Sequence, residues 1–191
     1  MGTLLSKALD RLAGVQEENI LMLGLDGVGK TTTLFQLQLG EAVCTLPTVG
    51  FNVEQVRYKS LLMTVWDIGG QDKIRRLWKH YYEGAHALIF VVDSSDVYRM
   101  EEAAKELEGI LLDPAMASCG AVLIYANKQD LMDSLPADEM MEVMNLNSSH
   151  PGLRGRKWLV QPCCAVSGVG IGEGIEWLSH VLTGDSSFSM R

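Results

Sequence analysis

The stretch Gly24-Leu25-Asp26-Gly27-Val28-Gly29-Lys30-Thr31 fits the pattern G-x-x-x-x-G-K-[ST] of a phosphate-binding loop. An apolar run precedes it at 20–23 and a run with helical spacing follows it, so the loop joins a predicted strand to a predicted helix. An ordinary strand–helix corner is the alternative, which these flanks disfavour. In such a loop backbone N–H groups and the lysine face a phosphate chain, and the threonine hydroxyl meets Mg²⁺. The pattern predicts phosphate contacts from Gly24, Asp26, Gly27, Val28, Gly29, Lys30, Thr31 and Thr32.

A second motif, Asp67-Ile68-Gly69-Gly70-Gln71, follows another predicted strand. An aspartate there can hold an Mg²⁺-bound water, a glycine N–H can reach a terminal phosphate, and a glutamine can orient an attacking water. Taken alone, D-x-G-G is a common turn. Downstream of a phosphate loop it predicts Asp67 near the metal, Gly70 at the terminal phosphate and Gln71 as the catalytic residue.

The tetrad Asn127-Lys128-Gln129-Asp130 indicates which base the site takes. The Asp130 carboxylate can accept two hydrogen bonds from guanine, from N1–H and from the 2-amino group, and adenine has neither donor. A site built for such bonds rejects the other base by roughly 10⁴-fold. Asn127 can bridge the loop and the base, and the stem of Lys128 can cover the ring. N-K-x-D alone fits a polar turn equally well, but its position after the first two motifs favours guanine.

Composition bounds the remaining possibilities. The chain has 191 residues with 47% hydrophobic and 21% charged content, which is typical of one globular domain. Its net charge of −8 argues against a nucleic-acid partner. The four cysteines have no C-x-x-C spacing and are expected to be buried reduced thiols. No run of 18 apolar residues and no secretory signal are present, so we expect no membrane-spanning helix.

We predict an α/β fold with a six-stranded, mostly parallel sheet, one antiparallel strand and helices on both faces. The antiparallel strand belongs to a hairpin of 51–58 and 61–66, because only two residues join these runs. The other strands are expected at 19–25, 87–92, 121–126 and 158–164, and the helices at 30–39, 73–82, 100–112, 134–146 and 173–183. A polar loop is expected at 147–157. Met140, Met141 and Met144 are expected to fill the core rather than to form a binding face.

Residues 1–15 have the spacing of an amphipathic helix, and Met1 to Ser6 fits the N-myristoylation signal on Gly2. One acyl chain gives only marginal membrane binding, with K on the order of 10⁴ M⁻¹, so an apolar helix face is the second signal required. A core-packing helix with a coincidental glycine is the alternative. We therefore divide the chain into a lipidated helix at 1–17, a nucleotide-binding domain at 18–184 and a short tail at 185–191.

Together these residues resemble the Arf/Arl (ADP-ribosylation factor) family of Ras-superfamily small GTPases, from Gly2 to about Leu182. Pro47 to Asn52 is similar to the family's switch I, and Trp66 to Gln71 to the start of its switch II. The resemblance implies the P-loop NTPase fold of a small-GTPase G domain that binds GTP or GDP with Mg²⁺ and hydrolyses GTP. It implies that Thr31 and, in the GTP state, Thr48 ligate Mg²⁺, with Asp67 acting through water. It also implies a guanine contact at Cys164 and Ala165, where a backbone N–H can meet O6.

The same resemblance implies a cellular role. In the family the hairpin between the switches slides when GTP binds and ejects the N-terminal helix, which enters the membrane; here the hairpin is 51–67. Three aromatic residues, Phe51, Trp66 and Tyr81, match the surface that Arf-like proteins present to effectors. The implied partners are an exchange factor, a GTPase-activating protein, effectors and a membrane surface. The implied location is the cytoplasm with reversible association to the Golgi or another endomembrane, in vesicle and protein transport.

Three departures from the family pattern stand out. Gly27-Val28 replaces a pair of small residues, Val166 replaces a polar residue after the Cys-Ala pair, and the loop at 147–157 is slightly long. Asp26 places a carboxylate near the phosphates, so its side chain is expected to turn away. No arginine lies between Leu39 and Thr48, so we predict slow intrinsic hydrolysis, with an arginine worth about 10³–10⁵ in rate coming from a partner.

Two other functions share part of this set of motifs with a GTP-driven switch. A nucleoside or nucleotide kinase shares the phosphate loop, but it has no use for the N-K-x-D tetrad beside D-x-G-G. A guanine-nucleotide-binding scaffold that hardly hydrolyses is disfavoured by Gln71 and Thr48. The substitution Gln71→Leu distinguishes the switch from the scaffold, because a cycling switch loses partner-stimulated turnover and a scaffold does not.

Overall fold

The structure is a computed structural model that describes residues 16–39, 51–58, 61–68 and 70–184. These residues form a six-stranded sheet with the order β2-β3-β1-β4-β5-β6. All neighbouring strands are parallel except β2 and β3, so the predicted fold class is confirmed. The bounds are β1 (Gln16–Leu23), β2 (Phe51–Tyr58), β3 (Leu61–Ile68), β4 (Ala87–Asp93), β5 (Ala121–Asn127) and β6 (Lys157–Pro162).

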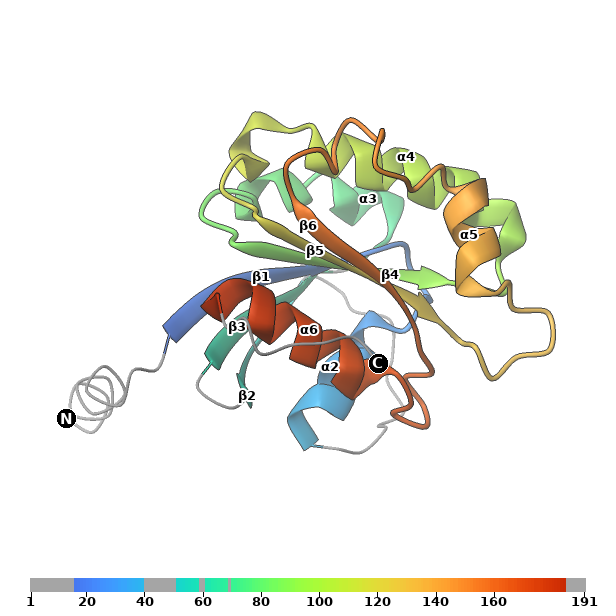
Figure 1. Cartoon of the computed structure of the whole chain (residues 1–191), viewed down its shortest axis with the longest axis horizontal. Coiled ribbons are helices and arrows are strands. Elements are labelled where there is room, and N and C mark those ends of the chain that lie inside the picture. The colour runs from blue at the N-terminus through green and yellow to red at the C-terminus, as the bar shows by residue number, and fades with distance from the viewer. Residues whose placement is uncertain (1–15, 40–50, 59–60, 69, 185–191) are drawn as a thin grey trace.

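Helices cover both faces of the sheet (Figure 1). On one face lie α2 (Lys30–Leu39) and α6 (Ile171–Thr183), which contact each other, and on the other lie α3 (Asp72–Arg75) and α4 (Met100–Leu111). The short α5 (Ala137–Val143) packs beside α4 and β6. Strands β4 and β5 are buried along almost their whole length, which explains their continuous apolar sequence. This core holds the carboxyl ends of the parallel strands at one edge, where the three motifs meet.

Two predicted helices are shorter than expected. The segment predicted as one helix at 73–82 is α3 followed by a 3₁₀ turn at Trp78–Tyr81. Its backbone bonds span three residues, as from Leu77 N–H to Ile74 C=O, and this tighter winding accompanies the complete burial of Trp78. The helix predicted at 134–146 is reduced to α5, because Pro136 is extended and Asn145 adopts a positive φ of 54°.

Strand and helix ends shift by a few residues elsewhere. Strand β1 runs from Gln16 to Leu23 instead of 19–25, and α6 begins at Ile171 instead of Glu173. Strand β6 begins at Lys157 and ends before Cys163. The hairpin is antiparallel, as predicted, and its register places Tyr58 opposite Leu61 across the short link.

The core contents agree with the sequence. Met140 and Met144 are fully buried and Met141 packs partly against them, so the core reading of these methionines is confirmed. Cys119, Cys163 and Cys164 are buried free thiols, and burial raises the pKa of Cys119 to about 11. No helix of the described residues is long and apolar enough to cross a membrane.

The loop predicted to be polar at 147–157 is anchored by one half-buried side chain. The guanidinium of Arg156 donates to four main-chain carbonyls: Cys119 at 2.8 Å, Leu111 at 2.8 Å, Met116 at 2.8 Å, and Gly152. The carbonyls belong to the end of α4, the turn before β5 and the loop itself. One side chain therefore fastens the end of the sheet that lies opposite the carboxyl ends of the strands.

We expect Arg156→Ala to lower the free energy of unfolding by about 3 kcal/mol, because hydrogen bonds from a charged donor are lost and several carbonyls keep no partner. Urea denaturation measures this change. The exposed Arg154, two residues away, provides the matched control, and its alanine variant should unfold like the parent. Equal stability of the two variants would contradict an anchoring role.

Candidate functional site

The phosphate loop leaves β1 and enters α2, as its sequence predicts (Figure 1). Its glycines at 24, 27 and 29 all have positive φ values. At Gly29 (φ 97°) an added Cβ would lie 2.5 Å from the Asn127 Nδ2 atom, so a side chain is excluded by both conformation and space. The loop lies at the carboxyl edge of the sheet, and its tip, Asp26 and Gly27, is exposed. Thr32 lies half-buried in the first turn of α2.

Lys30 is buried against the loop it closes. Its ammonium group donates to the carbonyls of Gly24 at 3.0 Å and Leu25 at 2.8 Å. Burial lowers the pKa of Lys30 to about 8, and the negative charges of Asp67 and Asp26 oppose that shift only in part. A cation that the fold buries at a cost, beside bare N–H groups, suits a phosphate chain.

This pKa predicts a proton linkage. Phosphate binding favours the charged ammonium and raises its pKa again, so above about pH 8 the empty site takes up a proton when it binds nucleotide. Affinity therefore falls as the pH rises through about 8. At about pH 8.5 we expect uptake of roughly 0.7 proton per GDP, measured by calorimetry of nucleotide-stripped protein in two buffers of different ionisation enthalpy.

The variant Lys30→Arg is the control for this linkage. A guanidinium stays charged throughout this pH range, so its GDP binding should take up no proton. Equal proton uptake by the variant and the parent would assign the linkage to another group.

Two of the three residues predicted to hold Mg²⁺, Thr31 and Asp67, lie in contact. The Thr31 hydroxyl donates to the Asp67 carboxylate at 2.6 Å, and Asp67 is completely buried at the end of β3. A hydroxyl and a carboxylate are the hard oxygen ligands that Mg²⁺ takes, usually completed by water and phosphate oxygens. Among the described residues, no cluster of three or more His, Cys, Asp or Glu side chains could hold a metal ion. Thr48 lies outside the described residues.

Gly70 lies directly against the phosphate loop. A Cβ at this residue would meet the Leu25 carbonyl carbon at 2.3 Å, the Gly24 oxygen at 2.4 Å and the Asp26 nitrogen at 2.5 Å. Only a residue without a side chain allows this approach. The Gly70 carbonyl accepts a 2.8 Å bond from the Nε atom of Arg75, and the next residue, Gln71, is exposed at the start of α3.

Asn127 joins three segments of the site. Its Nδ2 atom donates to the Val28 carbonyl at 2.8 Å, and its Oδ1 atom accepts the Ala165 N–H at 2.9 Å. The predicted bridge to the phosphate loop is thus present. Because the Ala165 N–H already has a partner, a contact from it to guanine O6 requires that bond to be shared or exchanged. Cys164 is buried beside it.

The rest of the tetrad is held at the end of β5. Lys128 has a positive φ of 67°, a conformation that costs energy for any side chain and that is common at functional sites. Its ammonium pairs with Asp93 at 2.6 Å, an interaction that the sequence pattern did not identify. Burial raises the pKa of Asp93, but the hydrogen bonds from Lys128 and Ser95 outweigh this effect and leave it lowered. Asp130, two residues on, is exposed and open to a ligand.

The structure brings together two of the three predicted effector residues. The rings of Trp66 on β3 and Tyr81 after α3 are 5.4 Å apart and tilted by 42°. The backbone of Phe51 opens β2, but its side chain lies outside the described residues, as does Gly2.

Comparison with known proteins agrees with this geometry. A family model described as the ADP-ribosylation factor family matches residues 5–182. The chain belongs to the ADP-ribosylation factor (Arf) family. Among solved structures, the Arl6 BBS3 small GTPase from Trypanosoma brucei with a bound nucleotide analogue, GppNp, is 32% identical. The match covers 90% of this chain and 100% of that one, with a TM-score of 0.80.

Membership gives this Arf-family protein its general activity. It is a small GTPase whose site takes a guanine nucleotide, and GTP hydrolysis is the reaction of its family. The kinase alternative is thereby removed.

Proposed function

We propose that this Arf-family GTPase is a switch whose terminal phosphate controls attachment to a membrane, where it recruits effectors for vesicle transport at the Golgi or another endomembrane. The observation that carries the proposal is the approach of Gly70 to Gly24, Leu25 and Asp26. From this position its N–H can meet the terminal phosphate that GTP has and GDP lacks. The contact that distinguishes GTP from GDP is then made just after the end of one strand, β3.

The position of β3 in the sheet supports a mechanical link. Strand β3 pairs with β1 on one side and with β2 on the other. If β3 moved along its own axis, its register with β1 would change, and β2 would move with it wherever their pairing is kept. A shift by one residue would turn every side chain to the wrong face, so a slide of two residues is the smallest that keeps the core. Such a slide would act on residues 1–15, which precede β1 in the chain. GTP produces it only by binding the slid state more tightly.

The site residues have the following proposed roles. Lys30 and the loop N–H groups hold the phosphates, Thr31, Thr48 and Asp67 hold Mg²⁺ (the last through water), and Gln71 places the attacking water. Mg²⁺ would supply positive charge between the terminal phosphates. Asn127, Lys128 and Asp130 hold guanine, and Trp66 and Tyr81 face effectors. The exchange factor and the GTPase-activating protein are partners by the same reasoning.

Liposome co-sedimentation of the Gly2-acylated protein tests the proposal. Protein loaded with GppNp should sediment with the vesicles, and protein loaded with GDP should remain in solution. Unacylated Gly2→Ala protein is the control and should bind poorly in both states, since one of two membrane signals is lost. Equal sedimentation of the acylated protein in both states would contradict control by the nucleotide.

Hydrolysis is proposed to need a partner. Two arginines lie near the phosphate loop, but carboxylates hold both: Arg75 pairs with Glu102 at 2.7 Å, and Arg99 pairs with Asp26 at 2.7 Å. Neither is placed as a free finger, so single-turnover GTP hydrolysis by the protein alone should be slow, on the order of 10⁻⁴ s⁻¹.

The variant Gln71→Leu should slow this intrinsic reaction about tenfold further, because the water loses its positioning group. It should also abolish stimulation by an Arf-family GTPase-activating domain. GDP affinity is the control and should not change. A parent protein that reaches several turnovers per second without a partner would refute the requirement.

A further inference from the structure

Asp26 is an electrostatic anomaly of the phosphate loop. It places a negative charge between residues whose N–H groups face phosphates, yet it is open to solvent on one side, with 47% of its side chain exposed. Its carboxylate accepts a 2.7 Å bond from the Nη2 atom of Arg99, and its main-chain carbonyl lies 3.3 Å from the Nη1 atom. Although partial burial opposes the shift, these contacts with Arg99 hold the pKa of Asp26 below its ordinary value.

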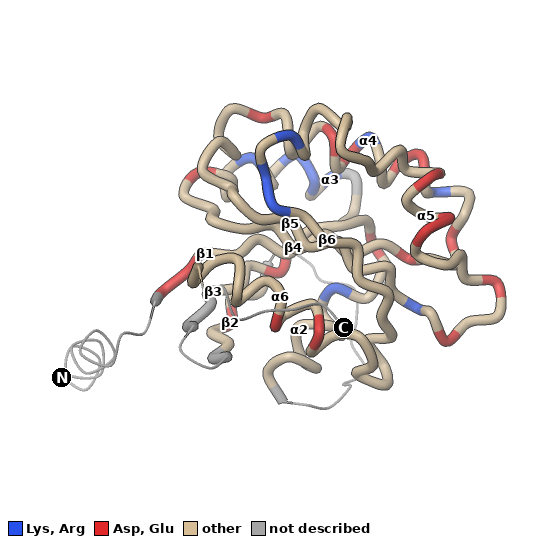
Figure 2. Tube along the Cα trace, in the orientation of Figure 1, with Lys and Arg blue, Asp and Glu red and all other residues tan. Residues whose placement is uncertain are grey.

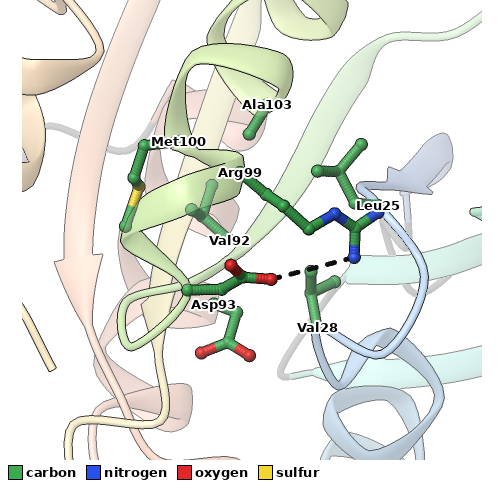
Figure 3. A pocket seen from close by; sticks show the side chains of 8 residues that line it. Leu25, Val28, Val92, Asp93, Arg99, Met100 and Ala103 are labelled. Atoms are coloured by element: carbon green, nitrogen blue, oxygen red, sulfur yellow. Dashed lines mark ion pairs between the residues drawn. The ribbon is translucent and has the colours of Figure 1, made fainter. Parts of the chain in front are cut away.

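Arg99 reaches the loop from the start of α4. Figure 3 shows its side chain extending across a small pocket toward Leu25 and Val28. The guanidinium also pairs with Asp96, three residues earlier, at 3.9 Å. The lining beneath it is largely apolar, with Val92, Met100 and Ala103. Apolar surroundings reduce solvent screening, so the guanidinium acts on Asp26 more strongly than a fully solvated one would.

A second arginine continues the connection. Glu102 on α4 accepts from Arg99 at 3.0 Å and pairs with Arg75 at 2.7 Å. Arg75 is only 9% exposed, pairs also with Glu106 at 2.8 Å, and donates to the Gly70 carbonyl. An alternating series of charged groups therefore runs from Asp26 past the start of α4 to the Gly70 carbonyl. Figure 2 colours the acidic and basic positions of α4 along the chain trace.

We propose that Arg99 is a positioning residue of the phosphate site. It holds the Asp26 carboxylate beside α4 and partly neutralises it, so that the terminal phosphate of a triphosphate can bind next to Gly70. This role rests on the proposed nucleotide switch and adds a specific discrimination to it. Without Arg99 the carboxylate is free to turn toward the added negative charge, which GTP carries and GDP does not.

The test compares nucleotide affinities of four proteins: the parent, Arg99→Ala, Asp26→Asn and the double variant. Dissociation constants for fluorescent GppNp and GDP give the preference as a ratio. We expect Arg99→Ala to weaken GppNp relative to GDP by about tenfold, the size of one partly screened charge repulsion at several ångströms. The double variant should return the ratio to within about twofold of the parent, because the repelling charge is gone. Asp26→Asn alone should bind GppNp at least as tightly as the parent.

Lys105→Ala is the matched control. It also removes one positive charge from α4, but that lysine pairs with Glu101 on the exposed side, so the ratio should not change. Urea denaturation of all variants separates binding from folding. An unchanged ratio for Arg99→Ala, or equal weakening of both nucleotides without rescue in the double variant, would reduce Arg99 to a structural contact. If the parent itself binds neither nucleotide, the nucleotide switch fails and this inference fails with it.

Discussion

The substitution Asp130→Asn is expected to weaken GDP binding by about 10³–10⁴-fold, because the proposed bonds from two guanine donors to the carboxylate are replaced by a clash of donors. An asparagine carbonyl can still accept from guanine N1–H. Its NH₂ group then faces the 2-amino group of the base, and neither has a partner. Xanthine carries an oxygen in place of the 2-amino group, so xanthosine diphosphate should bind the variant more tightly than it binds the parent. Displacement of fluorescent GDP by GDP and by xanthosine diphosphate measures both changes.

Asp133→Asn serves as the control for this result. Asp133 is an exposed aspartate three residues further along the same loop, so its variant removes the same charge without touching the proposed base site. It should bind GDP like the parent. A loss of affinity common to both variants would point to a general charge effect, and a variant of Asp130 that keeps its preference for guanine would place the base elsewhere.

The substitution Gly70→Ala is expected to weaken GppNp by about 10²-fold while GDP affinity changes by less than about threefold. The added methyl carbon would lie 2.3–2.5 Å from three main-chain atoms of residues 24–26, which cannot move aside as a flexible side chain would. Residues 67–70 would therefore be displaced from the loop. GDP tolerates that displacement because it has no terminal phosphate for the Gly70 N–H to meet. Competition binding with the two nucleotides measures the split.

Gly109→Ala is the matched glycine variant. Gly109 lies on α4 with no atom within 4 Å of an added Cβ, so the change is free of clash and favours the helix. It should leave both affinities unchanged. Equal loss of GDP and GppNp binding in Gly70→Ala would show that this glycine serves the folded loop and not the terminal phosphate.

Sequence reasoning located the motifs because each lies within a short, continuous stretch. The antiparallel pairing of 51–58 with 61–66 was predicted for the same reason, since a two-residue link allows little else, and the structure confirms it. The helix predictions at 73–82 and 134–146 were less accurate, because apolar spacing there suggested longer helices than the structure has. Burial of Trp78 and the backbone of Pro136 and Asn145 set those limits, and these effects depend on tertiary packing.

The sequence did not predict which side chains far apart in the chain would contact one another. The awkward charge of Asp26 was recognised and its side chain was expected to turn away, but nothing local identified Arg99, 73 residues later, as its partner. The ion pair of Lys128 with Asp93 and the hydrogen bond from the Ala165 N–H to Asn127 were likewise not predicted. Such contacts arise only when strand ends meet at one edge of the sheet. They refine the site from a set of motifs to a connected network.

The central claim is that the terminal phosphate sets the position of β3 and, through it, of the N-terminal segment. Amide hydrogen exchange of the full chain, loaded with GDP or with GppNp, tests it most directly. With GppNp, peptides covering 61–71 should exchange more slowly, because Gly70 is held at the loop. Peptides covering 1–15 should exchange faster, because the segment before β1 is released. Identical exchange in both regions under the two nucleotides would contradict the account, leaving a guanine-nucleotide-binding protein without the proposed switch.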